Sequence, residues 1–316
     1  MIRREIMEKL EAITPEEEAL LNGSTTIDRE LYMAGAGDVV TGYKLLKPDR
    51  LITVRPSTRF VHFPEHTHDY VEIVYMCQGS TTHIINGIRI ELRAGDVLLL
   101  AQNARQEILP AGRDDIAVNF IVKPEFFSPI LQTLGEETLL KRFICGCLCG
   151  ETGTSYLLFR VGDVLPVCNL VENLIYSLLN ETSSMHEIDR ATMSLLFFHL
   201  LNYTDKLSFG EAEQNVIVYV LRYVEENYRS GSLSEIAAAT NYNITWLSRR
   251  IRQQTGKNFT TLIQEKRMAQ AAWFLRNTDS NVDEIARAVG YENLSYFHKL
   301  FYAAYGTSPK KYRDRK

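Results

Sequence analysis

The 316-residue chain lacks any apolar run long enough to cross a membrane. Its first residues, MIRREIMEKLEAITPEEEALL, carry charges throughout, which is not the pattern of a secretory signal. Cysteine is scarce as well, because five in a chain of this length are too few for the disulfide framework of a secreted protein. These absences predict a cytoplasmic protein with reduced thiols and no contact with a membrane.

The chain does contain enough apolar material for a core. Hydrophobic residues make up 45% of the sequence, and the length fits two domains better than one. The net charge of -4 is divided unevenly: residues 214–316 hold 16 Lys and Arg against 9 Asp and Glu, whereas the preceding residues hold 19 against 30. A basic C-terminal part joined to an acidic body indicates that the C-terminal part meets a polyanion.

Short strands are predicted between about residues 50 and 122. In IINGIRIEL, Asn86-Gly87 separates two runs of alternating apolar residues, which is typical of a hairpin with a type I′ turn. After Gly95-Asp96, the segment VLLL predicts another buried strand. Regularly spaced strands with polar turns favour a small antiparallel barrel or sandwich.

Helices are predicted on both sides of this barrel. Residues 2–21 predict one or two short helices, and residues 125–206 predict more. In PVCNLVENLIYSLLNET the apolar residues recur at intervals of three and four, and the next helix, DRATMSLLFFHLLNYTDKL, is apolar on more than one side. These helices either form a dimer contact or pack under the barrel. Residues 207–215, LSFGEAEQN, are predicted to be a linker.

The C-terminal part contains an internal repeat. The segment SLSEIAAATNYNITWLSRRIRQQTG aligns with NVDEIARAVGYENLSYFHKLFYAAYG with one inserted residue. Glu235-Ile236-Ala237 matches Glu284-Ile285-Ala286, and Gly256 matches Gly306. Each copy has the parts of a helix-turn-helix: a first helix, a short turn, and a second helix that packs through two apolar residues and leaves its opposite face free.

The free face of each second helix is predicted to contact DNA. It carries short polar or cationic side chains, which suit base edges and phosphates. The alternative is a helical bundle with a solvated charged face, but two copies with the same exposed chemistry favour DNA binding. The predicted contact residues are Asn243, Thr245, Ser248, Arg249 and Arg252 in the first copy, and Asn293, Ser295, His298 and Lys299 in the second.

Between the copies lies NFTTLIQEKRMAQAAWFLRNT, which predicts a helix of about 19 residues and therefore roughly 28 Å long. Successive major-groove openings on one face of DNA are about 34 Å apart. A stiff helix of this length can hold two reading helices in adjacent turns of the groove, with some bending of the DNA.

Three motifs together, SLSEIAxxxxYxxxxLSRxI, EKRMAQAAWFL and DEIAxxVGYxxxSYFxKLFxxxxGTSPKKYR, resemble the DNA-binding domain of AraC/XylS-type transcriptional regulators. The resemblance covers residues 214–316 and implies two helix-turn-helix modules on one monomer, with the helices at 243–254 and 293–304 entering DNA. Arg250 departs from the pattern, because the family usually has an apolar residue there.

The front part of the chain is similar to cupin barrels, which such regulators often use as the effector domain. HTHDYVE followed by Gly79 is similar to the first cupin motif, and Gln106 stands where metal-binding cupins place a further histidine. His66, His68 and Glu72 have the spacing HxHxxxE and are candidate metal ligands, effector contacts or purely structural groups. The candidate effector-binding residues are His66, His68, Tyr70, Glu72 and Gln106.

A second candidate sensor is the CxCxC segment at Cys145, Cys147 and Cys149. On a strand, the three thiols would line one face, where they could share a soft metal or be oxidised. The alternative is that they are small buried hydrophobic residues.

The sequence therefore predicts an α+β protein. A cupin-like antiparallel β-barrel with flanking helices, residues 1–206, is expected to bind an effector and to dimerise, and an all-α domain of two helix-turn-helix modules joined by a long helix, residues 216–316, is expected to bind double-stranded DNA. The predicted function is a sequence-specific transcriptional regulator, with no enzyme activity and no cofactor, that is modulated by a small molecule. A sugar is a candidate effector, and an aromatic acid or a drug-like amphiphile fits the aromatic residues near the pocket equally well. A homodimer is the expected assembly, and RNA polymerase is a candidate partner.

Two alternatives remain open at this point. The first is a metal-dependent cupin enzyme that carries a DNA-binding appendage, for which the HxHxxxE residues would hold the metal. The second is a barrel that binds no small molecule and serves only as a dimerisation scaffold.

Overall fold

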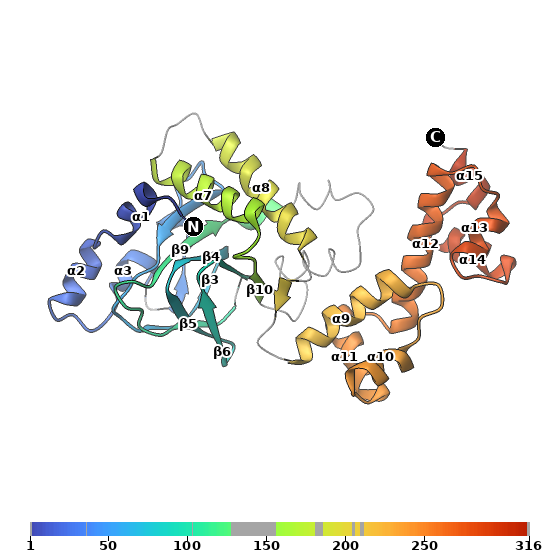
Figure 1. Ribbon diagram of the computed structural model, residues 1–316, viewed down its shortest axis with the longest axis horizontal. Coiled ribbons are helices and arrows are strands. Elements are labelled where there is room, and N and C mark those ends of the chain that lie inside the picture. The colour runs from blue at the N-terminus through green and yellow to red at the C-terminus, as the bar shows by residue number, and fades with distance from the viewer. Residues whose placement is uncertain are drawn as a thin grey trace. The chain divides into compact units, whose positions relative to one another are not determined.

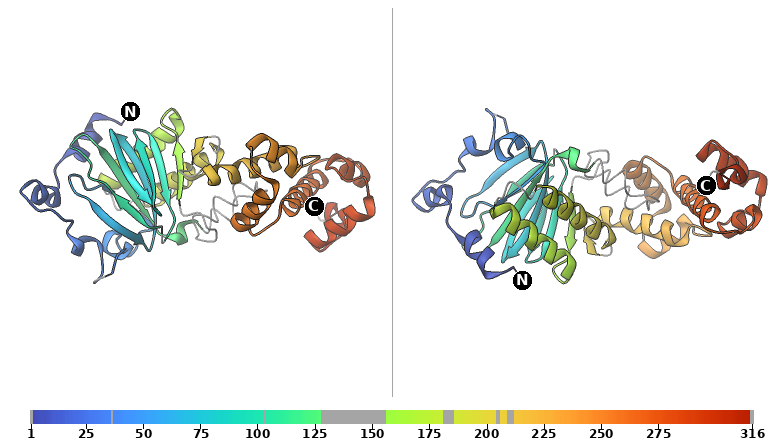
Figure 2. Two further views of the ribbon diagram at one scale, coloured as in Figure 1. Left: turned by 90° about the horizontal axis from the view of Figure 1, so that it is seen from below. Right: turned by 90° about the horizontal axis from the view of Figure 1, so that it is seen from above.

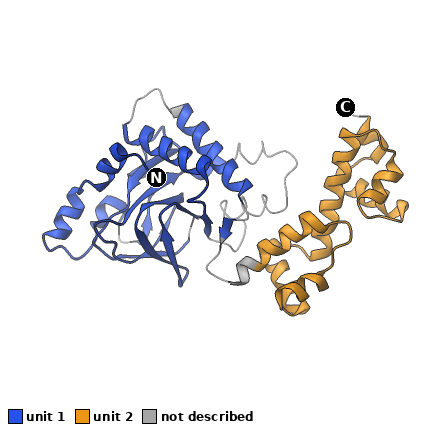
Figure 3. Ribbon diagram, viewed as in Figure 1, with its two compact units in different colours: residues 1–133, 144–212 blue, residues 134–143, 213–316 orange. Residues whose placement is uncertain are grey.

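The computed structural model describes residues 2–35, 37–102, 104–127, 156–180, 186–203, 206–208 and 212–314. The described residues up to Ala212 form one compact unit, and those from Glu213 onward form a second (Figure 3). The three cysteines of the CxCxC segment lie outside the described residues. None of the described helices combines the length and the apolar character needed to cross a membrane.

Two β-sheets form the centre of the first unit (Figure 1). The first sheet has, in spatial order, strands β1 (Val39–Val40), β3 (Phe63–His68), β8 (Gln106–Ile108), β5 (Ser80–Ile85) and β6 (Ile88–Arg93). The second has β11 (Leu207–Ser208), β10 (Tyr156–Arg160), β7 (Asp96–Leu100), β4 (Val71–Gln78), β9 (Ile116–Val122) and β2 (Ile52–Pro56). Among the described strands, only the short β1 pairs in parallel, with β3.

The core of this unit lies between the two sheets. Val74 and Met76 of β4 join Ile85 of β5 and Leu92 of β6 in one buried cluster, because alternate side chains of a strand point to the same face. Six successive residues of β4 are buried. This strand therefore shows no alternation of buried and exposed residues, since both faces of its sheet are covered.

Two helices cover the outer face of the second sheet. Helices α7 (Leu165–Asn180) and α8 (His186–Asn202) pack against each other, and α7 also packs against β2. They are the yellow-green helices that cross the strands in Figure 2. The predicted apolar stripe of α7 is buried at Val167, Val171, Leu174, Ile175 and Leu178.

The predicted hairpin is confirmed. Strands β5 and β6 pair with Ile85 opposite Ile88. Asn86 and Gly87 between them have φ values of 52° and 82°, so both central residues of the turn lie in the left-handed region, as a type I′ turn requires.

The N-terminal segment folds into the helices α1 (Arg4–Glu11), α2 (Pro15–Leu21), α3 (Arg29–Tyr32) and α4 (Gly42–Leu45). Thr14 and Glu17 form a capping box at the start of α2, with Pro15 in its first turn. Glu17 also pairs with Arg59 over 2.7 Å, and both side chains are almost completely buried. This ion pair fastens the N-terminal helices to the first unit.

The barrel boundaries predicted from the sequence are too narrow. Strand β10 pairs with β7 although it lies beyond residue 122, and β1 comes from the N-terminal segment. After β9 the chain forms a short 3-10 helix, η1 (Pro124–Phe126), at the proline where the strand pattern ends. The first four residues of YLLFR in β10 are buried, because they fill the second sheet next to β7, whereas Arg160 is exposed.

The predicted linker, residues 207–215, differs from the structure at both ends. Leu207 and Ser208 form β11, which pairs with β10. Helix α9 (Ala212–Asn227) then begins before the predicted end of the linker, because Glu213 and Gln214 are good helix formers and continue into the apolar run that follows.

The second unit consists of helices only: α9, α10 (Leu233–Thr240), α11 (Ile244–Thr255), α12 (Phe259–Asn277), α13 (Val282–Ala288), α14 (Leu294–Tyr305) and α15 (Pro309–Arg313). Helix α12 runs from the group formed by α9, α10 and α11 to the group formed by α13, α14 and α15 (Figure 1). We call these groups the first and the second module. The predicted connecting helix of about 19 residues is confirmed by α12, which has 19.

The internal repeat corresponds to a structural repeat. Leu247 and Ile251 of α11, like Phe297 and Phe301 of α14, are completely buried. Gly256 and Gly306 end the two helices with φ values of 70° and 67°, a left-handed conformation that favours glycine. The two modules therefore expose equivalent faces of α11 and α14.

Candidate functional site

The first unit encloses a cavity of about 40 Å³, which has room for about three water molecules. Both sheets and the N-terminal segment supply its walls. Residues with polar side chains outnumber apolar ones among those that line it, and they include Tyr32, Arg55, Thr58, His66, His68, Tyr70, Glu72, Thr81, His83 and Asn119.

Glu72 and His68 face this cavity from different strands. In the spacing HxHxxxE, His66, His68 and Glu72 are an even number of residues apart, which on one strand would place them on the same face. The chain passes from β3 to β4 after His68, however, so Glu72 belongs to the other sheet. Glu72 Oε1 accepts a hydrogen bond of 3.0 Å from Asn119 Nδ2, while its Oε2 lies 3.8 Å from His68 Nε2. Within the described part of the chain, neither Glu72 Oε2 nor His68 Nδ1 has a hydrogen-bond partner, although both atoms are buried.

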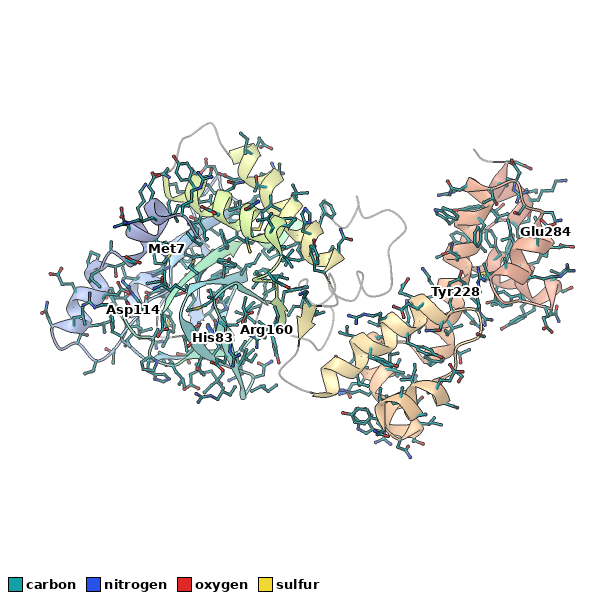
Figure 4. The ribbon with its side chains drawn as sticks, viewed as in Figure 1. Met7, His83, Asp114, Arg160, Tyr228 and Glu284 are labelled. Carbon is teal, nitrogen blue, oxygen red and sulfur yellow. The ribbon has the colours of Figure 1, made fainter. Side chains whose placement is uncertain are left out.

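His66 and His83 are held by neighbouring groups. His66 Nδ1 donates to the Pro64 carbonyl oxygen at 2.8 Å. Gln106 Nε2 donates to His83 Nδ1 at 2.9 Å, which leaves His83 Nε2 to donate to the Thr81 hydroxyl at 3.1 Å. Gln106 is completely buried beside the histidines and is not among the residues that line the cavity. Figure 4 labels His83 among the strands of the first unit.

Burial controls the charges in the cavity. It lowers the pKa of His66 to about 4 and that of His83 to about 3, and it lowers the pKa of His68 well below its ordinary value. Burial raises the pKa of Glu72 to about 7, although the neighbouring Gln106, Arg55 and Asn119 side chains oppose this shift. At neutral pH the histidines are therefore uncharged and Glu72 is about half protonated.

The arrangement of these residues does not favour a metal site. Among the described residues, no three His, Cys, Asp or Glu side chains are grouped so that they could hold a metal ion. His66 and His68 stack edge to face with their ring centroids 4.8 Å apart. Neutral imidazoles and a partly protonated carboxyl instead offer hydrogen-bond donors and acceptors side by side.

The N-terminal segment closes one side of the cavity through Tyr32. Its hydroxyl accepts from Arg55 Nη2 at 2.8 Å and donates to Glu16 Oε2 at 2.5 Å. The Arg55 guanidinium also lies 4.5 Å from the centroid of the Tyr32 ring. Burial raises the pKa of Tyr32 to about 12, so the phenol stays protonated and keeps its donor.

The cavity residues that were not found from the sequence include Tyr32, Arg55, His83 and Asn119. Two of them leave a signal in it. Asn119 is the one polar residue in the strand IAVNFIV, and His83 has the same parity as the buried Thr81 and Ile85 in β5. Arg55 and Tyr32 have no such signal, because only the pairing of β2 with β9 and the path of the N-terminal segment bring them to the cavity.

The faces predicted to contact DNA are exposed. On α11 these residues are Thr245, Ser248, Arg249 and Arg252, and on α14 they are Ser295, His298 and Lys299. Arg250 lies between the exposed and the buried faces of α11, where its Nη1 donates to Gln253 Oε1 at 3.3 Å. Its long side chain thus reaches the helix surface from a position that the family pattern fills with an apolar residue.

Asn243 and Asn293 have a structural task that the sequence analysis did not assign. Each is the N-cap of its helix: Asn243 Oδ1 accepts from the Thr245 amide at 2.8 Å, and Asn293 Oδ1 accepts from the Tyr296 amide at 3.0 Å. Both residues are exposed, at the start of α11 and of α14.

Comparison with known proteins gives the family. One family model, described as an AraC-like ligand binding domain, matches residues 51–137, and a second, described as a helix-turn-helix domain, matches residues 236–315. This chain belongs to the AraC-type transcriptional regulators. As in that family, a ligand-binding domain precedes a domain that binds DNA. A small molecule bound in the first domain modulates the activity of the regulator.

Two relatives that this chain matches over most of their length are transcriptional activators. The activator RhaS of Mannheimia succiniciproducens is 26% identical over 267 residues, which are 83% of this chain and 93% of that protein. RhaS of Klebsiella pneumoniae is 24% identical over 274 residues, which are 83% of this chain and 92% of that protein.

Two solved structures are also similar to it. The C-terminal domain of the response regulator AraT from Geobacillus stearothermophilus is 30% identical, with a TM-score of 0.32, and the match covers 34% of this chain and 89% of that one. Unsaturated fatty acid bound ToxT from Vibrio cholerae is 15% identical, with a TM-score of 0.36, and the match covers 83% and 94%.

Proposed function

We propose that this AraC-type regulator reads DNA with helices α11 and α14 and that its cavity binds a neutral, hydroxyl-rich small molecule of the sugar class. The observation that carries the second part is the pair of buried atoms without partners among the described residues, Glu72 Oε2 and His68 Nδ1. Leaving buried polar atoms without hydrogen bonds costs about 1–3 kcal/mol each, and a ligand hydroxyl that bonds to both removes this cost.

The chemistry of the cavity favours a neutral ligand over a charged one. The histidines are uncharged at neutral pH, and Glu72 is half protonated. A hydroxyl group can donate to Glu72 Oε2 and accept from a ring N–H, and Asn119 and Thr81 offer further polar contacts nearby. A cavity of about 40 Å³ must widen to admit a sugar, so we expect the side chains around Tyr32 to move when the ligand binds.

On the DNA side, we assign different tasks to the exposed residues. Arg249 and Lys299 stand at equivalent positions of the two modules, and we propose that they contact base edges or phosphates. The further contacts that we propose are made by Thr245, Ser248, Arg252, Ser295 and His298, with Asn243 and Asn293 at the helix starts beside the phosphates.

We also propose that the protein is a homodimer without enzyme activity that acts in the cytoplasm, where it meets the chromosome, and that it contacts RNA polymerase when bound to DNA. Exposed apolar side chains on α7 and α8 support a dimer: Tyr176 is 49% exposed, Ile188 56% and Leu195 47%. Large apolar side chains that stay exposed can take part in a protein contact.

A thermal-unfolding screen tests the ligand class. Monosaccharides and sugar alcohols are compared with aromatic acids and fatty acids as probes. A ligand at a hundred times its dissociation constant adds about 2.7 kcal/mol, which corresponds to roughly 5–10 °C for a domain of this size. We expect a shift with at least one sugar or sugar alcohol and its loss in Asn119→Ala. A shift with only an aromatic or fatty acid would overturn the proposed class.

A further inference from the structure

One side chain in the second unit joins the two modules by hydrogen bonds. Arg267, on helix α12, donates from Nε to the Tyr228 carbonyl at 2.7 Å and from Nη2 to the Arg229 carbonyl at 2.6 Å. It also donates from Nη1 to the Gly290 carbonyl at 3.1 Å. Tyr228 and Arg229 directly follow α9 in the first module, whereas Gly290 is in the turn of the second helix-turn-helix.

The backbones that Arg267 joins are in direct contact. Gly290 has a φ of 93°, and a Cβ atom on it would lie 2.5 Å from the Arg229 carbonyl oxygen. The guanidinium carbon of Arg267 also lies 5.1 Å from the centroid of the Tyr291 ring, which is buried. Tyr228 is labelled in Figure 4, where the two halves of the second unit meet.

The three acceptors suit an arginine, because each of its three side-chain nitrogens donates to one of them. The guanidinium is planar and its donors point in fixed directions. The three carbonyl groups that it bonds are therefore held in fixed positions relative to one another. The carbonyls after α9 lie at the negative end of that helix, where a cation is also favoured. Apolar contacts between α12 and the two modules are not directional and hold such positions less strictly.

Neighbouring side chains of α12 each reach only one module. Lys266 pairs with Glu225 of α9 at 2.7 Å, and Gln264 donates to the Tyr296 hydroxyl of α14 at 3.1 Å. Among these three, only Arg267 contacts both modules. We propose that Arg267 is a positioning residue that fixes α14 relative to α11, and therefore the spacing of the two DNA segments that one monomer can bind. This inference rests on the proposed function, because it requires both helices to contact the same duplex.

The test uses duplexes selected from a random library by the unaltered full-length protein. In derived duplexes, one base pair is added or removed between the two contacted segments, which turns one segment by about 34° and moves it by about 3.4 Å. We expect the unaltered protein to lose about tenfold in affinity on either change. Arg267→Ala should bind the original duplex more weakly and should differ by only about threefold between the three spacings.

Lys266→Gln is the matched control, because it removes an ion pair between α12 and α9 without touching the second module. It should keep the steep dependence on spacing. Arg267→Lys keeps the positive charge but loses the planar group of donors, so it should also weaken the dependence of DNA affinity on spacing. It serves as the test variant if Arg267→Ala does not show native helix content.

Two outcomes would overturn the inference. An Arg267 variant with the same steep dependence on spacing as the unaltered protein shows that the side chain does not set the distance, even if its overall affinity is lower. If the unaltered protein itself shows no preference for spacing, the proposal that two helices contact one duplex is wrong. The proposed role of Arg267 is then wrong as well.

Discussion

Asn119 on β9 and Glu72 on β4 share a hydrogen bond of 3.0 Å that satisfies only one of the two carboxyl oxygens. The other oxygen is buried beside the neutral His68 imidazole at 3.8 Å. The carboxyl is therefore held in place on one side and left open on the side of the cavity. Its protonation state is the property of this site that responds most to pH and to a ligand.

Glu72→Gln should change how stability depends on pH. The pKa of Glu72 is about 7 in the folded protein and 4.5 for an ordinary glutamate. Between these values the folded state keeps a proton that the unfolded chain releases, so Glu72 makes the protein less stable as pH rises through this window. The free energy of unfolding of Glu72→Gln minus that of the unaltered protein should rise by roughly 3 kcal/mol from pH 4.5 to pH 7.

The difference between two proteins is the quantity to measure, because the buried histidines act in the opposite direction. Their pKa values are lowered, so they cost stability as pH falls below 6.5. Urea unfolding at several pH values gives both curves. Glu91→Gln, at an exposed position of β6, is the control. A flat difference for Glu72→Gln would mean that this carboxyl is ionised throughout.

The buried pair of Glu17 and Arg59 should dominate the attachment of the N-terminal helices. Burial opposes the charge of Glu17, but hydrogen bonds from Arg59 and from backbone amides lower its pKa overall. Glu17→Gln leaves the buried Arg59 without its counter-charge, which costs about 3–5 kcal/mol. Glu18→Gln changes an exposed residue of the same helix and should cost less than about 0.5 kcal/mol in the same urea titration. Equal small losses in both variants would show that the pair does not fasten the segment.

Asn243→Asp should separate helix capping from DNA binding. Asparagine and aspartate cap helices about equally well, so the free energy of unfolding should change by less than about 0.5 kcal/mol. A carboxylate at the start of α11 would repel phosphates, and we expect the affinity for DNA to fall about tenfold. Asn258→Asp makes the same exchange at the N-cap of α12 and should leave DNA binding within about twofold of the unaltered protein. Similar affinities of the two variants in a gel-shift titration would argue against a DNA contact at the start of α11.

The C-terminal unit was predicted well from the sequence because its signals are local. Helix periodicity, the matching glycines at 256 and 306, and the apolar pairs of α11 and α14 are all contained in short segments. The equivalence of the two modules then predicted which faces would be exposed. Arg267 was missed, because its role depends on a contact between the end of α9 and a turn about sixty residues later.

The cavity was predicted only in part, because strand pairing decides which residues meet there. His66, His68 and Glu72 were found through their motif, yet the motif did not reveal that the last of them lies on the other sheet. Asn119 and Arg55 come from strands that pair only in the folded barrel. The sequence also placed Gln106 in the effector site; its side chain is buried and donates to His83, which lines the cavity, but Gln106 is not itself among the lining residues.

The most direct test of the central claim, that two helices read one duplex, is a gel-shift titration of Arg249→Ala and Lys299→Ala at two salt concentrations. Arg89→Ala, which removes the same charge from an exposed position of β6, is the control. We predict that each test variant loses about 1–3 kcal/mol and relaxes sequence preference at one position, or that its salt slope falls by about one unit if the contact is to phosphate. Unchanged affinity and salt slope for either variant, as for Arg89→Ala, would contradict reading by two helices.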